Sequence, residues 1–381
     1  MVAGEPSGDF LGAGLIEALA KRFPDARFEG IGGPHMQAAG LSSIYPLSSL
    51  SVMGLIEVIK HLPRLLAIRR SLRRRWLDDP PDVFVGIDAP DFNLGLAEYL
   101  RGGGIPTVHY VCPTVWAWRR GRTKKIYRAV DRVLCIYPFE PDLLKSDGID
   151  ACFVGHPIAD EIPINVERSA ARSELGIDAN AESVALLPGS RVTEVSRLMP
   201  IYLDVARRIL AHHPQVNFII PAATQALKQD IQQRLASTAL ASRTRVIDGQ
   251  ARSAMASADA AVIASGTATL EAMMLGCPAV IVYRVNALTA LIAKLTLKIQ
   301  WVGMPNLLAN KELMPEFIQG AARAELIAPE IIDMLNQPQR RLQLRAQFEQ
   351  LHLGLRCNAN ESAAKAVANL LNEPKNRHCE Y

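Results

Sequence analysis

Short apolar segments alternate along the chain with amphipathic ones, and each repeat predicts a strand followed by a helix. Strands are expected at 27–31, 83–87, 107–111, 132–136 and 152–154, and in a second series at 183–187, 217–220, 245–247, 260–263 and 279–282. Helices are expected between most of them, for example at 192–211 and 225–235. Strands that are apolar throughout and separated by helices indicate an α/β fold with parallel sheets covered on both faces.

A proline-marked stretch from His156 to Asn165 interrupts this rhythm and predicts a linker. We therefore expect one α/β lobe at 1–160 and a second at 161–337. The remaining region, 338–381, has helical patterns only, and we expect it to pack on the first lobe or on a partner chain. A length of 381 residues fits two or three domains.

The first strand is expected to be truncated. Only Met1, Val2 and Ala3 precede the turn that begins at Gly4, whereas a strand usually has five or six residues. A helix is expected directly after that turn, at 10–21.

Composition narrows the class of protein. Hydrophobic residues at 49% and charged residues at 21% exclude global disorder. The six cysteines include no C-x-x-C pair and no zinc spacing, so we expect reduced thiols in a cytosolic protein. No segment approaches the roughly 20 apolar residues of a spanning helix, and no cleavable signal sequence is expected. The net charge of +4 is too small to indicate a partner.

Two turns of the first half carry candidate chemistry, because ligands of open α/β sheets bind beyond the carboxyl ends of the strands. One is the turn Gly4-Glu5-Pro6-Ser7-Gly8-Asp9, where glycines allow close approach to the backbone. The other begins at Asp88, which ends an apolar strand and is suited to act as a general base. The alternatives are that Asp9 caps a helix and that Asp88 or, with a better fit, Asp91 caps the helix after it, as aspartates commonly do.

Two turns of the second half are typical of phosphate binding. Ser190 and Arg191 follow a strand and open a helix, which is a natural cradle for a diphosphate. Ser265, Gly266 and Thr267 do the same after a later strand, and Glu271 lies one helical turn further on. The alternative is ordinary capping, and neither turn has a P-loop ending.

The segment 55–76 reads LIEVIKHLPRLLAIRRSLRRRW, and no acid lies between Lys60 and Arg75. A basic amphipathic helix that ends in Trp76 fits an anchor on anionic lipid. An ordinary solvated face and a nucleic-acid patch are the alternatives.

Six motifs in register give the chain a family resemblance. They are VAGEPSGD, GIDAPDFN, VWAWR, LLPGSR, ASGTATLE and MPNLLAN. In this order they closely resemble the lipid-A-disaccharide synthase family of bacterial inverting glycosyltransferases. The resemblance implies a GT-B fold, in which two Rossmann-like lobes face a central cleft and the C-terminal helices cross back. It also implies an enzyme at the cytoplasmic face of the inner membrane.

The resemblance implies a reaction and its residues. UDP-2,3-diacylglucosamine and 2,3-diacylglucosamine 1-phosphate would give a β-1,6-linked tetraacyl disaccharide 1-phosphate and UDP, with no metal, other cofactor or nucleic acid. Asp88 would be the base, UDP would be held by Ser190, Arg191, Ser265, Gly266, Thr267, Glu271 and Asn306, and the acceptor side would comprise Glu5, Ser7, Gly8, Asp9 and Arg284. Acyl chains or anionic membrane lipid would contact Leu55, Ile59, Leu62, Leu65, Leu66 and Arg69.

Other interpretations remain open from the sequence. The C-terminal helices are a possible homodimer contact. A UDP-sugar epimerase shares the two-lobed plan but needs no acyl-chain surface. A non-catalytic protein that binds nucleotides or RNA through Arg69–Arg75 belongs to a different class.

Overall fold

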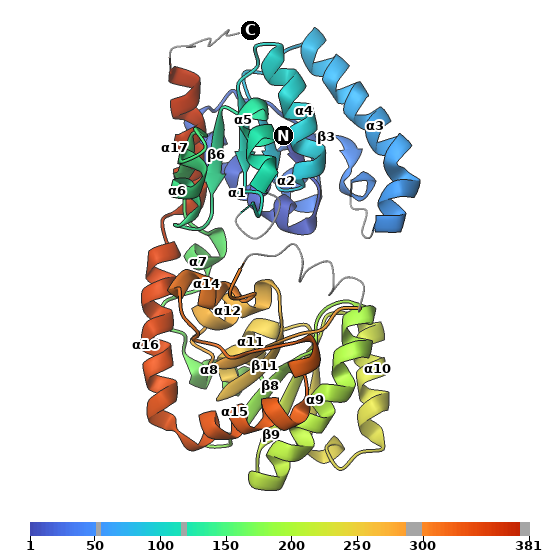
Figure 1. Ribbon diagram of the computed structural model, residues 1–381, viewed down its shortest axis with the longest axis vertical. Coiled ribbons are helices and arrows are strands. Elements are labelled where there is room, and N and C mark those ends of the chain that lie inside the picture. The colour runs from blue at the N-terminus through green and yellow to red at the C-terminus, as the bar shows by residue number, and fades with distance from the viewer. Residues whose placement is uncertain (51–54, 116–119, 287–298, 374–381) are drawn as a thin grey trace. The chain divides into compact units, whose positions relative to one another are not determined.

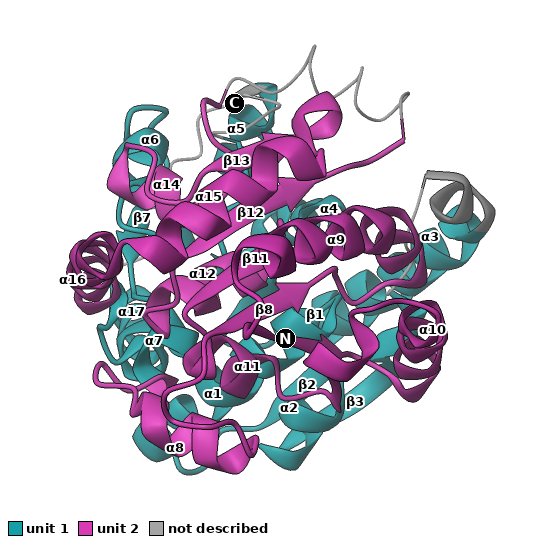
Figure 2. Cartoon of the chain, turned by 90° about the horizontal axis from the view of Figure 1, so that it is seen from below, with its two compact units in different colours: residues 1–160, 355–381 teal, residues 161–354 magenta. Residues whose placement is uncertain are grey.

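Two separate parallel β-sheets organise the chain (Figure 1). The computed structural model describes residues 1–50, 55–115, 120–286 and 299–373, except the side chains of residues 55–60 and 120. One compact unit comprises residues 1–160 and 355–381, and the other comprises 161–354 (Figure 2). Each unit is an α/β structure of the Rossmann-like kind, as the alternation of strands and helices predicts.

The first unit contains a seven-stranded sheet in the order β3-β2-β1-β4-β5-β6-β7. Its strands are β1 (Val2–Ala3), β2 (Phe28–Gly32), β3 (Leu41–Pro46), β4 (Phe84–Ile87), β5 (Thr107–Tyr110), β6 (Arg132–Cys135) and β7 (Ala151–Phe153). Its helices are α1 (Pro6–Arg22), α2 (Pro34–Ala38), α3 (Leu55–Asp78), α4 (Pro90–Gly102), α5 (Thr123–Ala129), α6 (Glu140–Lys145), α7 (Pro157–Glu161, at the boundary) and α17 (Ala359–Asn372), with 3-10 turns η1 (Leu47–Ser49) and η2 (Arg120–Arg122).

The second unit contains a six-stranded sheet in the order β10-β9-β8-β11-β12-β13. Its strands are β8 (Ser183–Leu187), β9 (Asn217–Ala222), β10 (Thr244–Asp248), β11 (Ala260–Ala264), β12 (Ala279–Tyr283) and β13 (Glu316–Ile318). Its helices are α8 (Arg168–Glu174), α9 (Val192–His212), α10 (Gln225–Ala236), α11 (Ala251–Ser257), α12 (Thr267–Met274), α14 (Met304–Ala309), α15 (Ala324–Asn336) and α16 (Pro338–Leu355), with η3 (Ala241–Arg243) and η4 (Gln319–Ala321).

All ten expected strands are present, with ends that shift by at most two residues. The sequence pattern missed β3 and β13, each of which lies at one of the two edges of its sheet. An edge strand is covered less completely, so it lacks the continuous apolar run that marks a central strand. β3 reads LSSIYP and β13 has three residues, none of them fully buried.

The first strand is as short as the sequence indicates. β1 has two residues, yet it lies in the middle of the sheet between β2 and β4. Val2 is opposite both Ile31 and Gly86, and Ala3 is opposite Ile87. Both side chains of β1 are completely buried, so the strand is held by packing as well as by pairing.

The C-terminal helices divide differently from the expected tail at 338–381. α16 groups with the second unit, and only the chain from Leu355 onward groups with the first. α17 packs against α1 of the same chain and buries Ala363, Ala364 and Val367. The chain thus returns to its own first unit, which is one of the two expected arrangements.

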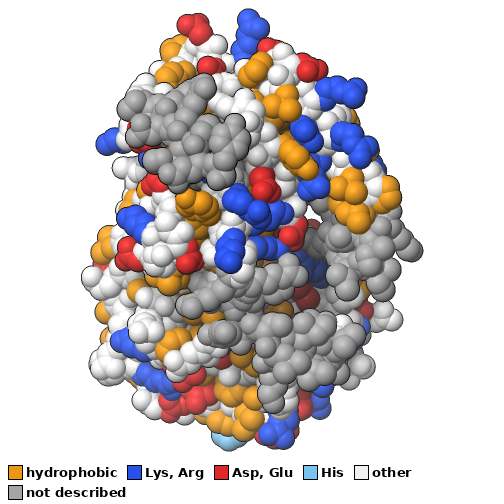
Figure 3. Space-filling view, turned by 45° about the horizontal axis from the view of Figure 1, so that its top comes forward, with side chains coloured by type: hydrophobic (Ala, Val, Ile, Leu, Met, Phe, Trp, Pro, Cys, Tyr) orange, Lys and Arg blue, Asp and Glu red, His pale blue; other side chains and the backbone are white. Residues whose placement is uncertain are grey.

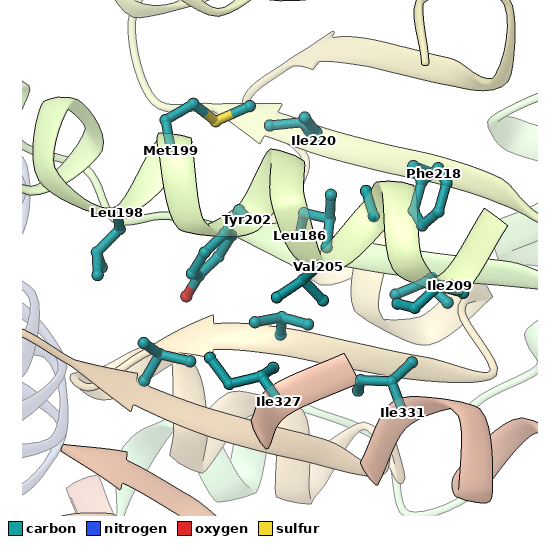
Figure 4. Close-up of a cluster of buried hydrophobic side chains, with 14 of the residues drawn as sticks. Leu186, Leu198, Met199, Tyr202, Val205, Ile209, Phe218, Ile220, Ile327 and Ile331 are labelled. Carbon is teal, nitrogen blue, oxygen red and sulfur yellow. The ribbon is translucent and has the colours of Figure 1, made fainter. Parts of the chain in front are cut away.

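The core of the second unit shows how one amphipathic helix joins two layers. Leu198, Tyr202, Val205 and Ile209 recur every three or four residues on α9 and are buried. They lie among side chains of the sheet and of α15 (Figure 4).

Within the described part of the chain, no helix is both long and apolar enough to cross a membrane.

Candidate functional site

The carboxyl ends of β1 and β4 bring two predicted motifs together in the first unit. These strands are parallel neighbours, so the turns that follow them emerge at one edge of the sheet. A Cβ on Gly4 would lie 2.5 Å from the Cβ of Ala89, which only a glycine avoids. The glycine-rich turn therefore lies directly against the turn that carries Asp88.

Asp88 sits at the start of an unusual turn. Asp88 and Ala89 both adopt left-handed conformations, with φ of 51° and 42°, which is rare for residues other than glycine. The Asp88 side chain is half-buried, and burial raises the pKa of its carboxyl above the usual aspartate value. A hydrogen bond from the Ala89 backbone opposes part of that shift. These properties fit a general base at a strand end.

Asn93 holds this turn in place. Its side chain is completely buried, and its Nδ2 donates to the carbonyls of Val2 at 3.1 Å, Ile87 at 3.3 Å and Asp88 at 2.8 Å. One amide thereby ties the ends of β1 and β4 to the left-handed turn. Asn93 ends the GIDAPDFN motif, but no pattern in the sequence predicted that it holds the turn.

Asp9 corrects the predicted acceptor side. Its carboxylate is 1% exposed and accepts hydrogen bonds from the backbone N–H groups of Gly33 at 2.7 Å, His35 at 3.1 Å and Met36 at 3.0 Å. It therefore caps the start of α2, 24 residues further along the chain, and is withdrawn from ligand contact. Asp9 is thus a helix cap, as the alternative had it, but it caps α2 and not α1, the helix that contains it.

The other residues of the glycine-rich turn keep different positions. Glu5 and Ser7 are exposed at the carboxyl edge of the sheet, where they are accessible to a ligand. Gly8 is buried, and a Cβ there would lie 3.4 Å from the Cβ of Ala3. Gly8 thus serves the close packing of α1 on the strands.

The start of α12 is the more open of the two turns predicted to bind phosphate. Ser265 is half-buried, and Gly266 and Thr267 are exposed. The N-cap of this helix is Gly266, which has no side chain to cap the first turn. Amide groups at an uncapped helix start favour an anion, because they carry the positive end of the helix dipole.

The predicted cradle at Ser190 and Arg191 is already filled. The Glu194 carboxylate accepts from the backbone N–H groups of Ser190 at 3.2 Å and Arg191 at 3.3 Å, and it pairs with the Arg191 guanidinium at 3.3 Å. Glu194 thereby takes the three donors expected for a diphosphate. A ligand phosphate at this turn would have to displace Glu194.

Glu271 lies one turn into α12 and is paired. Its Oε1 is 2.8 Å from Nε of Arg252, and Arg252 Nη1 is 3.2 Å from Glu161 Oε2. Arg252 follows β10 and was not singled out from the sequence. It brings a guanidinium next to the carboxylate expected to hold a ribose.

Asn306 serves the fold. It is completely buried, and its side chain bonds the backbone of Leu313 and Met314 and the Glu316 carboxylate. These bonds use the donors and acceptors of the side chain, so the predicted nucleotide contact would have to displace one of them. Arg284 is exposed just after β12, and its backbone carbonyl accepts from Arg197 on α9 at 3.1 Å.

The basic helix α3 has two different faces. Ile68, Leu72 and Trp76 are buried against the core, and the Trp76 indole donates to Glu29 at 2.5 Å. Trp76 is therefore a core residue, and its predicted place at a lipid interface is wrong. The other face exposes Leu62 by 45% and Leu66 by 39%.

The exposed face of α3 carries charge as well. Arg64, Arg70 and Arg74 are exposed, whereas Leu65 and Arg69 are half-buried. Figure 3 shows basic side chains interspersed with apolar ones over this part of the surface. The side chains of Leu55 and Ile59, and the residues 116–119 of the VWAWR motif, lie outside the described residues.

Among the described residues, a cluster of two cysteines and a glutamate has the residue types of a metal site. Cys112, Cys135 and Glu140 bring three ligand atoms within 4.8 Å of one another, all buried. A hydrogen bond to Cys112 and burial raise the pKa of the Cys135 thiol, which disfavours the thiolate that a metal needs. Glu140 already accepts from the Tyr137 backbone at 3.1 Å. The cluster fits core thiols better than a metal centre.

Comparison with known proteins adds an independent line of evidence. A family model described as lipid-A-disaccharide synthetase matches residues 1–367. Lipid-A-disaccharide synthases of Saccharophagus degradans and Alkalilimnicola ehrlichii are 49% and 48% identical, over 97% and 96% of this chain and 96% and 97% of theirs.

Solved structures with low sequence identity share the fold. A UDP-GlcNAc 2-epimerase from Neisseria meningitidis, bound to UDP-GlcNAc, has a TM-score of 0.61 at 14% identity and covers 97% of both chains. A glycosyltransferase from Rickettsia africae has a TM-score of 0.60 at 10% identity, over 98% of this chain and 97% of its own. The predicted GT-B class of two parallel-sheet lobes is thus confirmed.

Proposed function

The chain belongs to the lipid-A-disaccharide synthase family, and from that premise we propose how its residues carry out the reaction. It is a glycosyltransferase of lipid A biosynthesis. It transfers 2,3-diacylglucosamine from UDP-2,3-diacylglucosamine to 2,3-diacylglucosamine 1-phosphate. The products are the β-1,6-linked tetraacyl disaccharide 1-phosphate and UDP.

Asp88 is the general base of this proposal. The acceptor 6-hydroxyl oxygen attacks C1 of the donor sugar, its proton passes to the Asp88 carboxylate, and UDP departs with the electrons of the broken C1–O bond. A single displacement of this kind inverts the configuration at C1. The observation that supports the assignment is a half-buried carboxylate with a raised pKa at the end of β4, next to the exposed Glu5 and Ser7.

The donor diphosphate is assigned to the start of α12. The uncapped amides after Gly266, together with the hydroxyls of Ser265 and Thr267, stabilise the charge that develops on departing UDP. Glu271 accepts from the ribose hydroxyls, and Arg252 keeps its carboxylate oriented. Ser190 and Arg191 join the site when Glu194 yields to the phosphate, and no divalent cation takes part.

Asp88→Asn tests the base. Turnover should fall by about 10²–10⁴-fold, the usual contribution of a general base, while the Kd for UDP changes little. Asp91→Asn is the matched control, because Asp91 is an exposed carboxylate on the next helix that pairs with Arg122. UDP release is measured with both acylated sugars in detergent micelles, with and without EDTA. Near-normal turnover of the Asp88 variant would remove it from the role, and a strict need for divalent cation would overturn the metal-free mechanism.

The exposed face of α3 is proposed to bind anionic lipid at the cytoplasmic face of the inner membrane. Leu62 and Leu66 lie one helical turn apart and supply apolar area, and Arg70 and Arg74 supply positive charge on the same helix. A helix with this composition lies in the interface plane and does not span the bilayer. The acylated substrates of the enzyme reside in the same membrane interface.

Leu62→Ser combined with Leu66→Ser tests the lipid face. Vesicles of phosphatidylglycerol should bind the double variant about tenfold more weakly, because each lost leucine removes apolar area from the interface. Leu342→Ser with Leu353→Ser on α16 is the matched control, since those leucines are 55% and 46% exposed. Equal vesicle binding by both double variants would mean that α3 is an ordinary surface helix.

A homodimer through the C-terminal helices stays a prediction. α17 already buries one face against α1 within its own chain, and Glu361 pairs with Arg22 at 3.2 Å. A dimer would have to exchange this contact or use another face. Molar mass from light scattering in detergent decides between a monomer and a dimer.

A further inference from the structure

Arginines converge on a single carboxylate at the amino edge of the second sheet. Asp259 precedes β11 and accepts from the backbone N–H of Ser183, the first residue of β8, at 3.0 Å. The turns at Ser190 and Ser265 follow the carboxyl ends of the same two strands. The arginine cluster therefore lies at the edge of the sheet opposite the proposed donor site.

The charges of this cluster do not balance. The guanidinium nitrogens of Arg168, Arg172 and Arg341 lie 2.5, 3.1 and 4.0 Å from Asp259. Asp259 and Arg172 are among the buried residues of the chain, so water screens this group weakly. Asp259 is the carboxylate that these three side chains share, Asp178 adds a second negative charge near Arg172, and Arg345 adds a fourth cation nearby.

Two of the four arginines have donors to spare. Arg172 and Arg341 also bond backbone carbonyls and serve the fold. Arg168 donates through Nε to the Ser257 carbonyl at 3.2 Å, and its buried Nη2 lies 2.5 Å from Asp259 in a geometry that makes no hydrogen bond. Arg345 bonds the carbonyl of Gly276 through Nε at 3.1 Å. Burial and, to a smaller degree, the nearby charge of Arg168 lower the pKa of Arg345.

A cavity of about 370 Å³ opens beside these two arginines. Its walls come from residues 164–168, the end of α12 and α16, and Arg168 and Arg345 are the guanidinium groups that line it. The acids in the lining, Glu167 and Glu349, are exposed, whereas both arginines are partly buried. The lining therefore brings two partly buried guanidinium groups together with two more exposed carboxylates.

We infer that this cavity binds a phosphate group, either free or carried by a small phosphomonoester, at a site separate from the one proposed for UDP. Guanidinium groups bind phosphate oxygens through paired, charge-assisted N–H bonds, and two such groups suit a dianion. The volume accommodates a phosphate with a small organic substituent. Occupation would supply the negative charge that Asp259 alone does not.

Calorimetry with inorganic phosphate on the full chain tests the inference. Titrations are made at constant ionic strength and with UDP at saturation, so that the proposed donor site is occupied. Saturable binding of phosphate should persist under these conditions, with a Kd below about 10 mM. Loss of binding once UDP is present would place the phosphate in the donor site and overturn the inference, and so would the absence of saturation.

Variants locate the binding. Arg345→Gln should weaken phosphate affinity about tenfold or more and leave the Kd for UDP unchanged, because one fork of donors is lost. Arg345→Lys keeps the charge but lacks the paired N–H donors of a guanidinium, so its phosphate affinity should lie between those of the unchanged protein and Arg345→Gln. Arg207→Gln, an exposed arginine on α9, is the matched control. Circular dichroism checks folding, and unchanged phosphate affinity in a folded Arg345→Gln variant would refute the site. Asp88 takes no part in these titrations, so their failure leaves the proposed glycosyl transfer standing.

Discussion

Asn306→Asp is the sharpest test of whether Asn306 serves the fold or the nucleotide. Its Nδ2 donates to the Met314 carbonyl at 2.7 Å and to Glu316 Oε1 at 2.9 Å, and its Oδ1 accepts from Leu313 and Met314 N–H at 2.7 and 2.9 Å. Aspartate keeps the acceptor but turns the donor into an oxygen. That oxygen would face a carbonyl and a carboxylate inside a fully buried site.

The structure sets the size of the effect. One neutral hydrogen bond and one charge-assisted bond are lost, at about 1 and 1.5–3 kcal/mol, and repulsion between two carboxylates adds to this. The free energy of unfolding of the second unit should fall by about 3 kcal/mol or more. For a unit of this size, that lowers the melting temperature by about 6–12 °C.

Differential scanning calorimetry measures the change, and UDP titration well below the transition measures the site. Asn310→Asp is the matched control, since Asn310 is exposed and has a left-handed backbone that aspartate also tolerates. The loss of stability should shrink at acidic pH. Protonation of one of the two carboxylates relieves the repulsion between them. An unchanged melting temperature together with weaker UDP binding would refute the structural role and restore the nucleotide contact.

Three further predictions follow from the buried and capping groups. Glu194→Gln should tighten UDP binding several-fold in calorimetry, because the carboxylate no longer competes for the amides of the α9 turn. Asp204→Asn on the same helix is the control. Weaker UDP binding by Glu194→Gln would mean that Glu194 supports that turn. Asn93→Ala should lower turnover at least about tenfold and displace the acid limb of its pH profile, with UDP affinity kept; a parallel fall at every pH without displacement would contradict its positioning of the base. Burial lowers the pKa of His109 and of His156 to about 4. The unfolded chain therefore binds more protons between pH 6.5 and 4, and stability against urea should fall as the pH drops through this window, by up to about 3 kcal/mol for each histidine; a flat profile would contradict their neutral burial.

The local pattern determined the architecture of this protein. Ten strands, the helices between them and the turns at their carboxyl ends follow from apolar runs and from Gly, Pro and Ser positions, because these depend on neighbours a few residues away. The place of Asp88 belongs to the same class. A polar residue directly after a buried strand must emerge at the ligand-binding edge of the sheet, whatever the rest of the chain does.

Tertiary structure alone decided which polar residues face a ligand. Asp9 and Asn306 have the residue types of a binding site, yet groups 24–27 residues from Asp9 and 7–10 residues from Asn306 use up their hydrogen bonds. Trp76 turns inward to meet Glu29 from 47 residues away. Glu194 differs from these residues, because it lies only three and four residues from the amides of Arg191 and Ser190 that it binds. A carboxylate or an amide binds whichever donors come within reach, and sequence distance does not limit that reach. Only the packed chain shows which donors those are.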